Sequence, residues 1–176
     1  MKRNFLIVVV LFLSFSPSHL SAQKNELAFA VGGGALTGGA DTLGTKALTL
    51  SYARNIPWRL AIEGSLDLFW VRHDDGFNDD FGGATLSVHY HFLDPEQTGK
   101  LIPYVGAGVG KTTTDFTEIQ AQKLARLLGG VKYHFSDGWG LQVEVRDEIM
   151  EGSFYLVEPG KTINFPSVRV GIVRRF

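Results

Sequence analysis

The sequence predicts an all-β fold, an eight-stranded antiparallel up-and-down transmembrane β-barrel. Three observations support this prediction. Several segments alternate apolar and polar residues with a period of two, which is typical of strands and not of helices. Turn-forming residues separate these segments, and the connections are alternately short and long. After residue 22, no apolar run reaches the ~20 residues that a membrane-spanning helix needs.

The first 22 residues have the pattern of a secretory signal peptide. Lys2 and Arg3 form a basic start, and residues 5–15 are almost all apolar. This apolar stretch is too short to be a spanning helix. We therefore expect residues 1–22 to be removed on export, leaving residues 23–176 as one β-barrel domain.

The composition excludes several classes of protein. The chain has 17 Lys and Arg against 18 Asp and Glu, and the mature chain is mildly acidic once Lys2 and Arg3 are removed. It therefore lacks the basic surface that nucleic-acid binding needs. It has no Cys, which excludes both a disulfide framework and a lipid-anchored cysteine.

Two weak strands, residues 25–36 and 46–54, precede the clearest one, residues 58–70. In this third strand the even positions are mostly apolar and the odd positions are mostly polar. Trp58 and Trp70 stand twelve residues apart, which is ~40 Å of extended chain or ~28 Å along the membrane normal after tilting. That spacing fits one aromatic residue at each membrane interface.

The same alternation predicts strands over residues 81–92, 101–112, 123–135 and 139–149. The last strand, residues 167–176, has two distinct faces and ends on Phe176. Termini of soluble domains usually fray. An aromatic residue at the end of a two-faced strand therefore indicates that this end is held in a sheet.

The lengths of the connections predict which side of the membrane each end faces. Residues 55–57 and 136–138 form tight turns, whereas residues 93–100 form a longer connection on the same side. In outer-membrane barrels short turns face the periplasm and long loops face outward. The predicted external loops are residues 37–45, 71–80, 113–122 and 151–165.

A barrel of this size has an interior just wide enough for its own side chains. Charged residues of both signs occupy the polar faces, so we expect an ion-pair network that plugs the lumen. Its predicted members are Arg59, Glu63, Asp67, Lys132, Glu144, Arg146, Arg169 and Arg175. The predicted membrane-interface aromatics are Trp58, Trp70, Trp139 and Phe176.

Two motifs and the final residue carry a resemblance to a known family. Residues 102–110 read IPYVGAGVG, and residues 130–139 read GVKYHFSDGW. With Phe176 at the end, the chain resembles the small OmpA/OmpX-type outer-membrane β-barrel superfamily. The resemblance implies a monomer in the cell outer membrane that contacts outer-membrane lipids and lipopolysaccharide. It also implies assembly by periplasmic chaperones and the barrel-insertion machinery, with Phe176 as the assembly signal.

Three local patterns suggest other chemistries. Residues 105–112 approach the phosphate-binding G-x-x-x-x-G-K-[ST] loop, but Val105 stands where the first Gly is required. Ser87 and His89 share one strand face, so their hydroxyl and imidazole could form a Ser–His nucleophile pair. Residues 73–80 hold four carboxylates that a divalent cation could use. We expect a Gly-rich strand, lumen polar groups and a solvated loop, with no catalytic residue, metal or cofactor.

The favoured function is that of a non-enzymatic outer-membrane protein, which contributes to envelope integrity or surface interaction through its external loops. A narrow porin-like channel is the first alternative. A lipid A acyl-modifying enzyme is the second, because small barrels of this architecture include such enzymes. A soluble periplasmic barrel also stays open, because alternation alone does not say which face lies inside.

Overall fold

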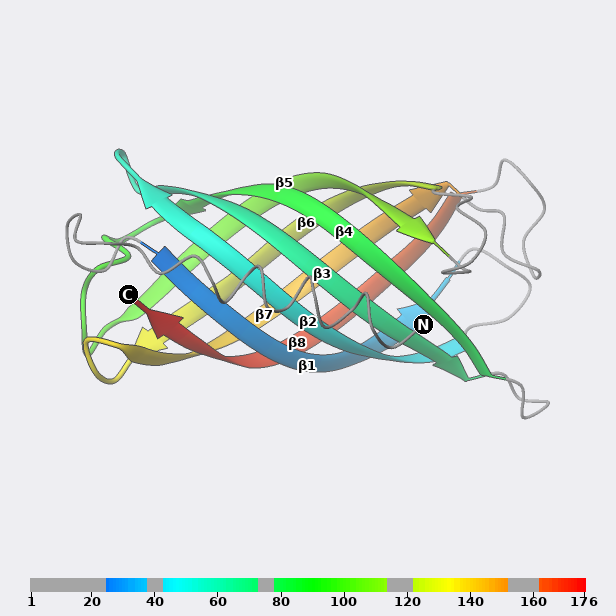
Figure 1. The fold of residues 1–176 in the computed structure, drawn as a ribbon, viewed down its shortest axis with the longest axis horizontal. Helices are drawn as coiled ribbons and strands as arrows, with labels where there is room; N and C mark the ends of the chain where they lie inside the picture. The colour runs from blue at the N-terminus through cyan, green and yellow to red at the C-terminus, as the bar shows by residue number, and fades with distance from the viewer. Residues whose placement is uncertain (1–24, 38–42, 73–77, 114–121, 152–161) are drawn as a thin grey trace, which may run out of the picture.

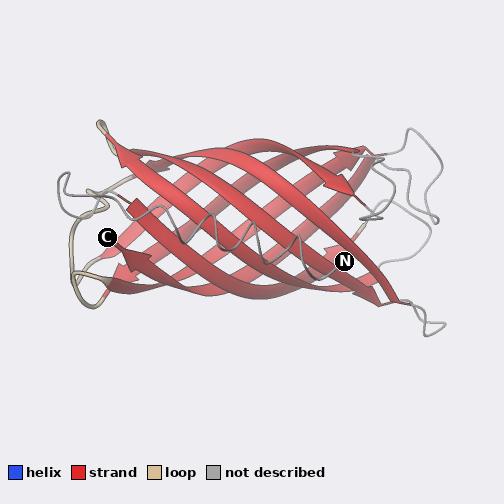
Figure 2. Cartoon of the chain, in the orientation of Figure 1, coloured by secondary structure: helices blue, strands red, loops and turns tan. Residues whose placement is uncertain are grey.

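A computed structural model describes residues 25–37, 43–72, 78–113, 122–151 and 162–176. They form eight strands: β1 (Asn25–Leu36), β2 (Leu43–Ile56), β3 (Leu60–Arg72), β4 (Asn78–His91), β5 (Leu101–Thr113), β6 (Gln122–His134), β7 (Trp139–Glu151) and β8 (Thr162–Arg175). Each strand pairs with the next, and β8 pairs with β1, so the sheet is a closed barrel (Figures 1 and 2). All eight pairings are antiparallel, which confirms the predicted fold class.

The two ends of the barrel differ, and we name them by their connections. The turn end carries the connections β2–β3, β4–β5 and β6–β7, together with the C-terminus (left in Figure 1). The loop end carries the other four connections, and most of their residues lie outside the described ranges. The predicted signal peptide, residues 1–22, also lies outside them.

Pairing of β1 with β8 closes the barrel and includes the last residue. Along this seam Glu26 pairs with Arg175 and Gly34 with Ser167. The Phe176 amide donates to the Asn25 carbonyl at 3.0 Å, and the Asn25 amide donates to the Phe176 carbonyl at 3.2 Å. The chain end is therefore held in the sheet, because its backbone groups complete the hydrogen-bond ladder.

Over most of the barrel wall, large apolar side chains point outward and polar side chains point inward. On β4, Leu86 and Val88 are 60% and 51% exposed, whereas Ser87 and His89 are 2% and 0% exposed. The same parity gives every strand an apolar outer face, and exposed members include Phe29, Val31, Ile62, Val105, Val109, Leu127, Val143, Val168, Val170 and Ile172. A soluble ligand-binding barrel would have the reverse arrangement, so the faces are those of a membrane-spanning barrel.

Several predicted strand boundaries are wrong, and those of β3 and β8 are the most informative. β3 begins at Leu60, and Trp58 and Arg59 lie in the preceding turn with φ of 67° and 62°. β8 begins at Thr162, five residues earlier than predicted. Its first inward residues, Ile163 and Phe165, are apolar, as are inward residues at the same end of other strands, so the polar-inside pattern does not apply there.

The Gly-rich strand β5 allows its neighbours to approach closely. A Cβ added to Gly108 would overlap the Ser87 hydroxyl on β4. After β5, the next described element is the strand β6. A phosphate-binding loop must lead into a helix, so the resemblance of residues 105–112 to that motif reflects close strand packing.

A charge placed on the outer face at mid-strand should prevent stable insertion. Val170 of β8 is half exposed and pairs with Val31 and Val143. Val170→Arg is expected to lower the free energy of unfolding from lipid vesicles by about 2–4 kcal/mol, because arginine at the bilayer midplane is poorly solvated. Urea titration with tryptophan fluorescence measures this change.

The matched control for Val170→Arg is Leu101→Arg, because Leu101 is also outward but lies at the turn end of β5. Leu101→Arg should lower the free energy of unfolding by no more than about 1 kcal/mol, because its charge lies near the membrane interface. Equal costs at the two positions would contradict a membrane-spanning barrel.

Candidate functional site

A buried ion cluster fills the middle of the barrel, and Asp67 of β3 is its centre. The Asp67 carboxylate accepts from Arg126 of β6 at 2.5 Å, from Arg146 of β7 at 3.2 Å, and from Arg169 of β8. The Thr49 hydroxyl of β2 also donates to it at 2.7 Å. One carboxylate therefore connects five strands across the lumen.

Two further carboxylates complete the cluster. Glu148 accepts from Arg126 at 2.7 Å and from Arg169 at 3.0 Å. Glu144 accepts from Nε of Arg146 on the same strand. Each arginine thus bonds at least one carboxylate, which offsets the cost of taking its charge out of water.

The charges inside the barrel are balanced. The buried acidic residues are Glu26, Glu63, Asp67, Glu144 and Glu148, and the buried basic residues are Arg126, Lys132, Arg146, Arg169 and Arg175. These sets each have five members among the described residues. A low-dielectric interior tolerates charges only when they are compensated, so this balance allows the polar lumen to exist.

A polar chamber lies between the ion cluster and the turn end. The Tyr104 hydroxyl of β5 donates to Glu144 at 2.8 Å, and its ring centroid lies 5.5 Å from that of His89 and 5.6 Å from that of His91. The Lys132 ammonium lies 5.2 Å from the Tyr104 ring centroid. The tyrosine therefore joins this chamber to the ion cluster.

Lys132 forms an ion pair with Glu26 of β1, and Asn55 donates to the same carboxylate at 3.4 Å. Several buried polar atoms of the chamber have no hydrogen-bond partner among the described residues, including both ring nitrogens of His89 and His134. Buried polar groups of this kind are usually satisfied by ordered water.

A hydrophobic cluster closes the lumen at the loop end. Its members are Leu36, Ala47, Phe69, Val71, Phe81, Leu124, Met150, Ile163 and Phe165. The Phe69 ring stacks on Phe81 with centroids 4.5 Å apart and meets Phe165 edge-on at 5.3 Å. The Arg169 guanidinium lies 5.3 Å from the Phe69 ring, so the hydrophobic cluster packs directly on the ion cluster.

The structure brings most of the predicted network residues together, with two differences. Glu63, Asp67, Lys132, Glu144, Arg146 and Arg169 lie inside as ion-pair partners. Arg175 is buried at the turn end, but it donates to the Pro95 and Ser136 carbonyls and the Thr98 hydroxyl. Arg59 is exposed in the β2–β3 turn, where its guanidinium donates to the Phe92 carbonyl at 2.9 Å.

The prediction for Arg59 is wrong because strand parity was applied to a residue outside the strand. Three network members were absent from the predicted set: Glu26, Arg126 and Glu148. Arg126 and Glu148 occupy the polar parity of their strands, so the alternation could have identified them. Glu26 is the second residue of the Gly-rich β1, whose alternation is weak.

The candidate nucleophile pair, Ser87 and His89, lies in the lumen, and its two side chains do not form a hydrogen bond with each other. Ser87 and His89 are both buried on β4. Neither the Ser87 hydroxyl nor a His89 ring nitrogen has a hydrogen-bond partner within the described ranges. Their side chains point away from the face that meets acyl chains, so this geometry offers no route to a lipid substrate.

No group of three or more potential metal ligands occurs among the described residues. Most of the acidic segment 73–80 lies outside them, including residues 73–77. Cation binding there stays a prediction.

Three of the four predicted interface aromatics lie on strands or at a strand end with partly exposed rings. Trp70 is near the loop end, and Trp139 and Phe176 are at the turn end. The Arg174 guanidinium lies 4.7 Å from the Trp139 ring. Trp58 is 86% exposed in a turn, outside the strand that was predicted to carry it.

No family model and no curated protein matches the chain. Among solved structures, Neisserial surface protein A superposes with a TM-score of 0.69 at 14% identity, covering 89% of this chain and 100% of that one. The outer membrane enzyme PagL gives 0.60 at 19% identity, covering 83% and 97%. OprG from Pseudomonas aeruginosa gives 0.52 at 12% identity, covering 90% and 98%.

These similarities concern the fold. At such low identities, the neighbours show that the chain has the architecture of small outer-membrane β-barrels. They include an enzyme as well as proteins whose names state no activity, so function has to be argued from the residues of this chain.

Removing the central carboxylate should destabilise the barrel strongly. Asp67→Asn leaves three arginines with reduced compensation, and breaking a buried pair in this way typically costs about 3–5 kcal/mol. We expect a loss of this size in urea unfolding from vesicles.

The control for Asp67→Asn is Asp80→Asn, because Asp80 is exposed near the loop end. Surface charges contribute no more than about 1 kcal/mol. A similar small effect for both variants would show that the ion cluster does not stabilise the fold.

Proposed function

We propose that this chain is a non-enzymatic integral protein of the cell outer membrane, exported by a signal peptide in residues 1–22. It contributes to envelope integrity or surface interaction through its external loops, and its lumen is closed. The observation that carries this proposal is the double closure of the interior. An electroneutral ion cluster fills the middle, and an aromatic-rich hydrophobic cluster lies above it.

The proposed closed lumen rests on two separate barriers. A hydrated ion moving from the loop end must first displace packed apolar side chains, which offer it no ligands. It then meets cross-linked arginines and carboxylates that hold one another in place. This arrangement argues against the alternative of a narrow channel.

The enzyme alternative has less support. PagL is an outer membrane enzyme with the same fold, yet the only Ser–His pair singled out in this sequence lies buried in the lumen of the present chain. We therefore propose no catalytic residue.

The outer rim of the barrel supports contact with a phosphate-bearing lipid such as lipopolysaccharide. Lys46, Trp70, Arg72 and Asp80 line a hollow of about 810 Å³ near the loop end. Lys46 pairs in register with Trp70, and Arg72 follows two residues later on the same face. Two cations beside an interfacial indole are suited to bind lipid phosphates.

We further propose that assembly uses periplasmic chaperones and the barrel-insertion machinery, with Phe176 as the recognised residue, and that the protein is a monomer. The support for the role of Phe176 is its outward-facing, partly exposed ring, whose centroid lies 6.4 Å from that of Tyr52. Its backbone pairs with Asn25 where β8 meets β1.

Planar-bilayer recording tests the closed lumen. The refolded protein should give no discrete conductance steps, whereas a general porin in the same bilayers gives them. A triple variant, Phe69→Ala, Phe165→Ala and Arg169→Ser, should conduct, because it removes both barriers. Regular steps from the unmodified protein would instead favour the channel.

Neutralising the basic pair should weaken lipid contact. Lys46→Gln with Arg72→Gln is expected to reduce co-purified lipopolysaccharide about tenfold, since each lost charge-assisted hydrogen bond contributes substantially to binding. Mass spectrometry of bound lipid A measures it. The matched control is Arg54→Gln with Lys100→Gln, which removes two exposed cations near the turn end. Equal losses in both variants would contradict a specific site.

A further inference from the structure

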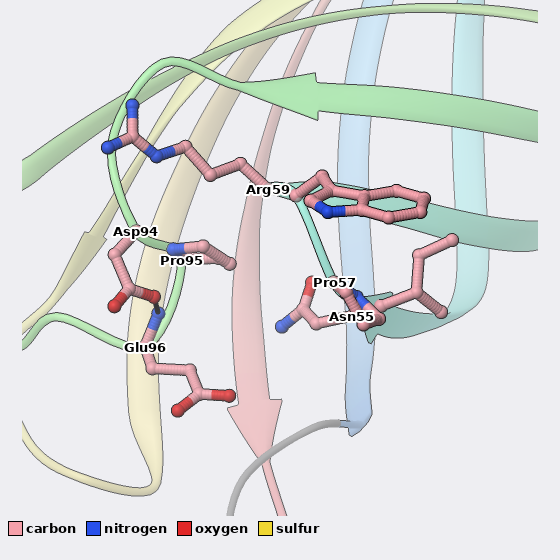
Figure 3. Close-up of a pocket in the computed structure, with 8 residues that line it drawn as sticks. Asn55, Pro57, Arg59, Asp94, Pro95 and Glu96 are labelled. Carbon is pink, nitrogen blue, oxygen red and sulfur yellow. Dashed lines mark hydrogen bonds between the residues drawn. The ribbon is translucent and has the colours of Figure 1, made fainter.

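A second pocket lies at the opposite end of the barrel, between the β2–β3 turn and the β4–β5 connection (Figure 3). Its volume is about 350 Å³, which is within the range of small-molecule sites. The residues that matter here are Asn55, Trp58, Arg59, Asp94 and Glu96. None of them belongs to the ion cluster or to the outer-rim hollow.

Asn55 provides an unsatisfied acceptor at the base of this pocket. Its side chain is 4% exposed, and its amide nitrogen donates to Glu26 at 3.4 Å. Its amide oxygen has no hydrogen-bond partner among the described residues. In Figure 3 the amide extends from β2 toward the connection that carries Pro95 and Glu96. A buried acceptor without a partner is costly, so the pocket is suited to a ligand that carries N–H donors.

The pocket also has charges of both signs. Asp94 and Glu96 contribute exposed carboxylates from the β4–β5 connection, and Arg59 reaches over the same connection (Figure 3). One guanidinium nitrogen of Arg59 is held by the Phe92 carbonyl at 2.9 Å. The other guanidinium N–H groups can bind an anion. A pocket lined by two carboxylates and a guanidinium complements a zwitterion that carries an ammonium and an anionic group.

The surroundings of the pocket indicate a lipid. Trp58 is 86% exposed, and both Trp58 and Arg59 have positive φ, a conformation that residues other than Gly adopt at a cost. Tyr90 on β4 and Phe92 directly after this strand are also exposed, and they pack edge-to-face with ring centroids 5.5 Å apart. Exposed aromatics of this kind occur where acyl chains meet headgroups.

We propose that this pocket binds the phosphoethanolamine headgroup of a phospholipid in the leaflet at the turn end. Asp94, Glu96 and the amide oxygen of Asn55 accept hydrogen bonds from the ammonium. Arg59 binds the phosphate, and Trp58 lies against the glycerol and the start of the acyl chains. That this is the periplasmic leaflet rests on the proposed orientation of the barrel in the membrane.

Native mass spectrometry of the refolded full chain in detergent tests the proposal. The probes are phosphatidylethanolamine, phosphatidylcholine and phosphatidylglycerol with identical acyl chains. Phosphatidylethanolamine should bind about tenfold more tightly than phosphatidylcholine, because methylation removes every ammonium N–H donor. Phosphatidylethanolamine should also bind more tightly than phosphatidylglycerol, which has no ammonium group.

Three variants assign this preference to the pocket. Asp94→Asn with Glu96→Gln should reduce the preference to less than about twofold, and Asn55→Leu should reduce it as well. Arg59→Gln should weaken phosphatidylethanolamine and phosphatidylcholine alike, because both carry the phosphate. The control, Asp137→Asn, removes an exposed carboxylate that lines neither this pocket nor the outer-rim hollow, and it should leave the preference unchanged.

Each variant is first checked for folding by comparing the migration of boiled and unboiled samples. Equal binding of the three lipids would overturn the proposal, because the pocket would then not distinguish between headgroups. Tighter binding of phosphatidylglycerol, or a preference that survives the loss of Asp94 and Glu96, would overturn it too. Lipid selectivity in detergent depends neither on conductance nor on membrane sidedness, so it can fail while the proposed function holds.

Discussion

Closure of the sheet is the constraint on which the rest of this structure depends. In hydrocarbon each unpaired backbone group costs several kcal/mol, so the edges of β1 and β8 must pair. Eight strands close around a space that holds only side chains. A side chain at an inward position must therefore fit the narrow lumen, and a charged one needs a partner of opposite charge. Gly108 leaves space for Ser87, and Asp67 has three arginines.

The ion cluster is stable only as a set. Coulombic attraction offsets the desolvation of buried charges when geometry is good and further hydrogen bonds satisfy the remaining atoms. Here Thr49 donates to Asp67, and Ser65 bonds both Asp67 and Arg126. Members come from β3, β6, β7 and β8, which are not all neighbours in the sheet. The cluster thus links strands across the lumen by ion pairs, in addition to the backbone hydrogen bonds between neighbouring strands.

The period of two was enough to predict the fold class and the inward side of Glu63, Asp67 and Arg169. It failed at Arg59, because parity has meaning only inside a strand and the turn places two residues at positive φ. It also missed the hydrophobic cluster around Phe69, because inward residues were expected to be polar along the whole strand. Pairs such as Lys132 with Glu26 lie 106 residues apart. They depend on how strands are staggered around the closed barrel, which alternation does not report.

The two halves of the lumen differ in the polarity of their side chains. From the loop end, water would have to pass the packed rings of Phe69, Phe81 and Phe165, which provide no hydrogen bonds. From the turn end it meets the Asn55 amide oxygen, the His134 ring nitrogens and other polar atoms that lack a hydrogen-bond partner among the described residues. Hydration of the polar chamber must therefore come from the turn end. The ion cluster lies between the polar chamber and the hydrophobic cluster, and it contacts the first through Glu144 and Tyr104 and the second through Arg169 and Phe69.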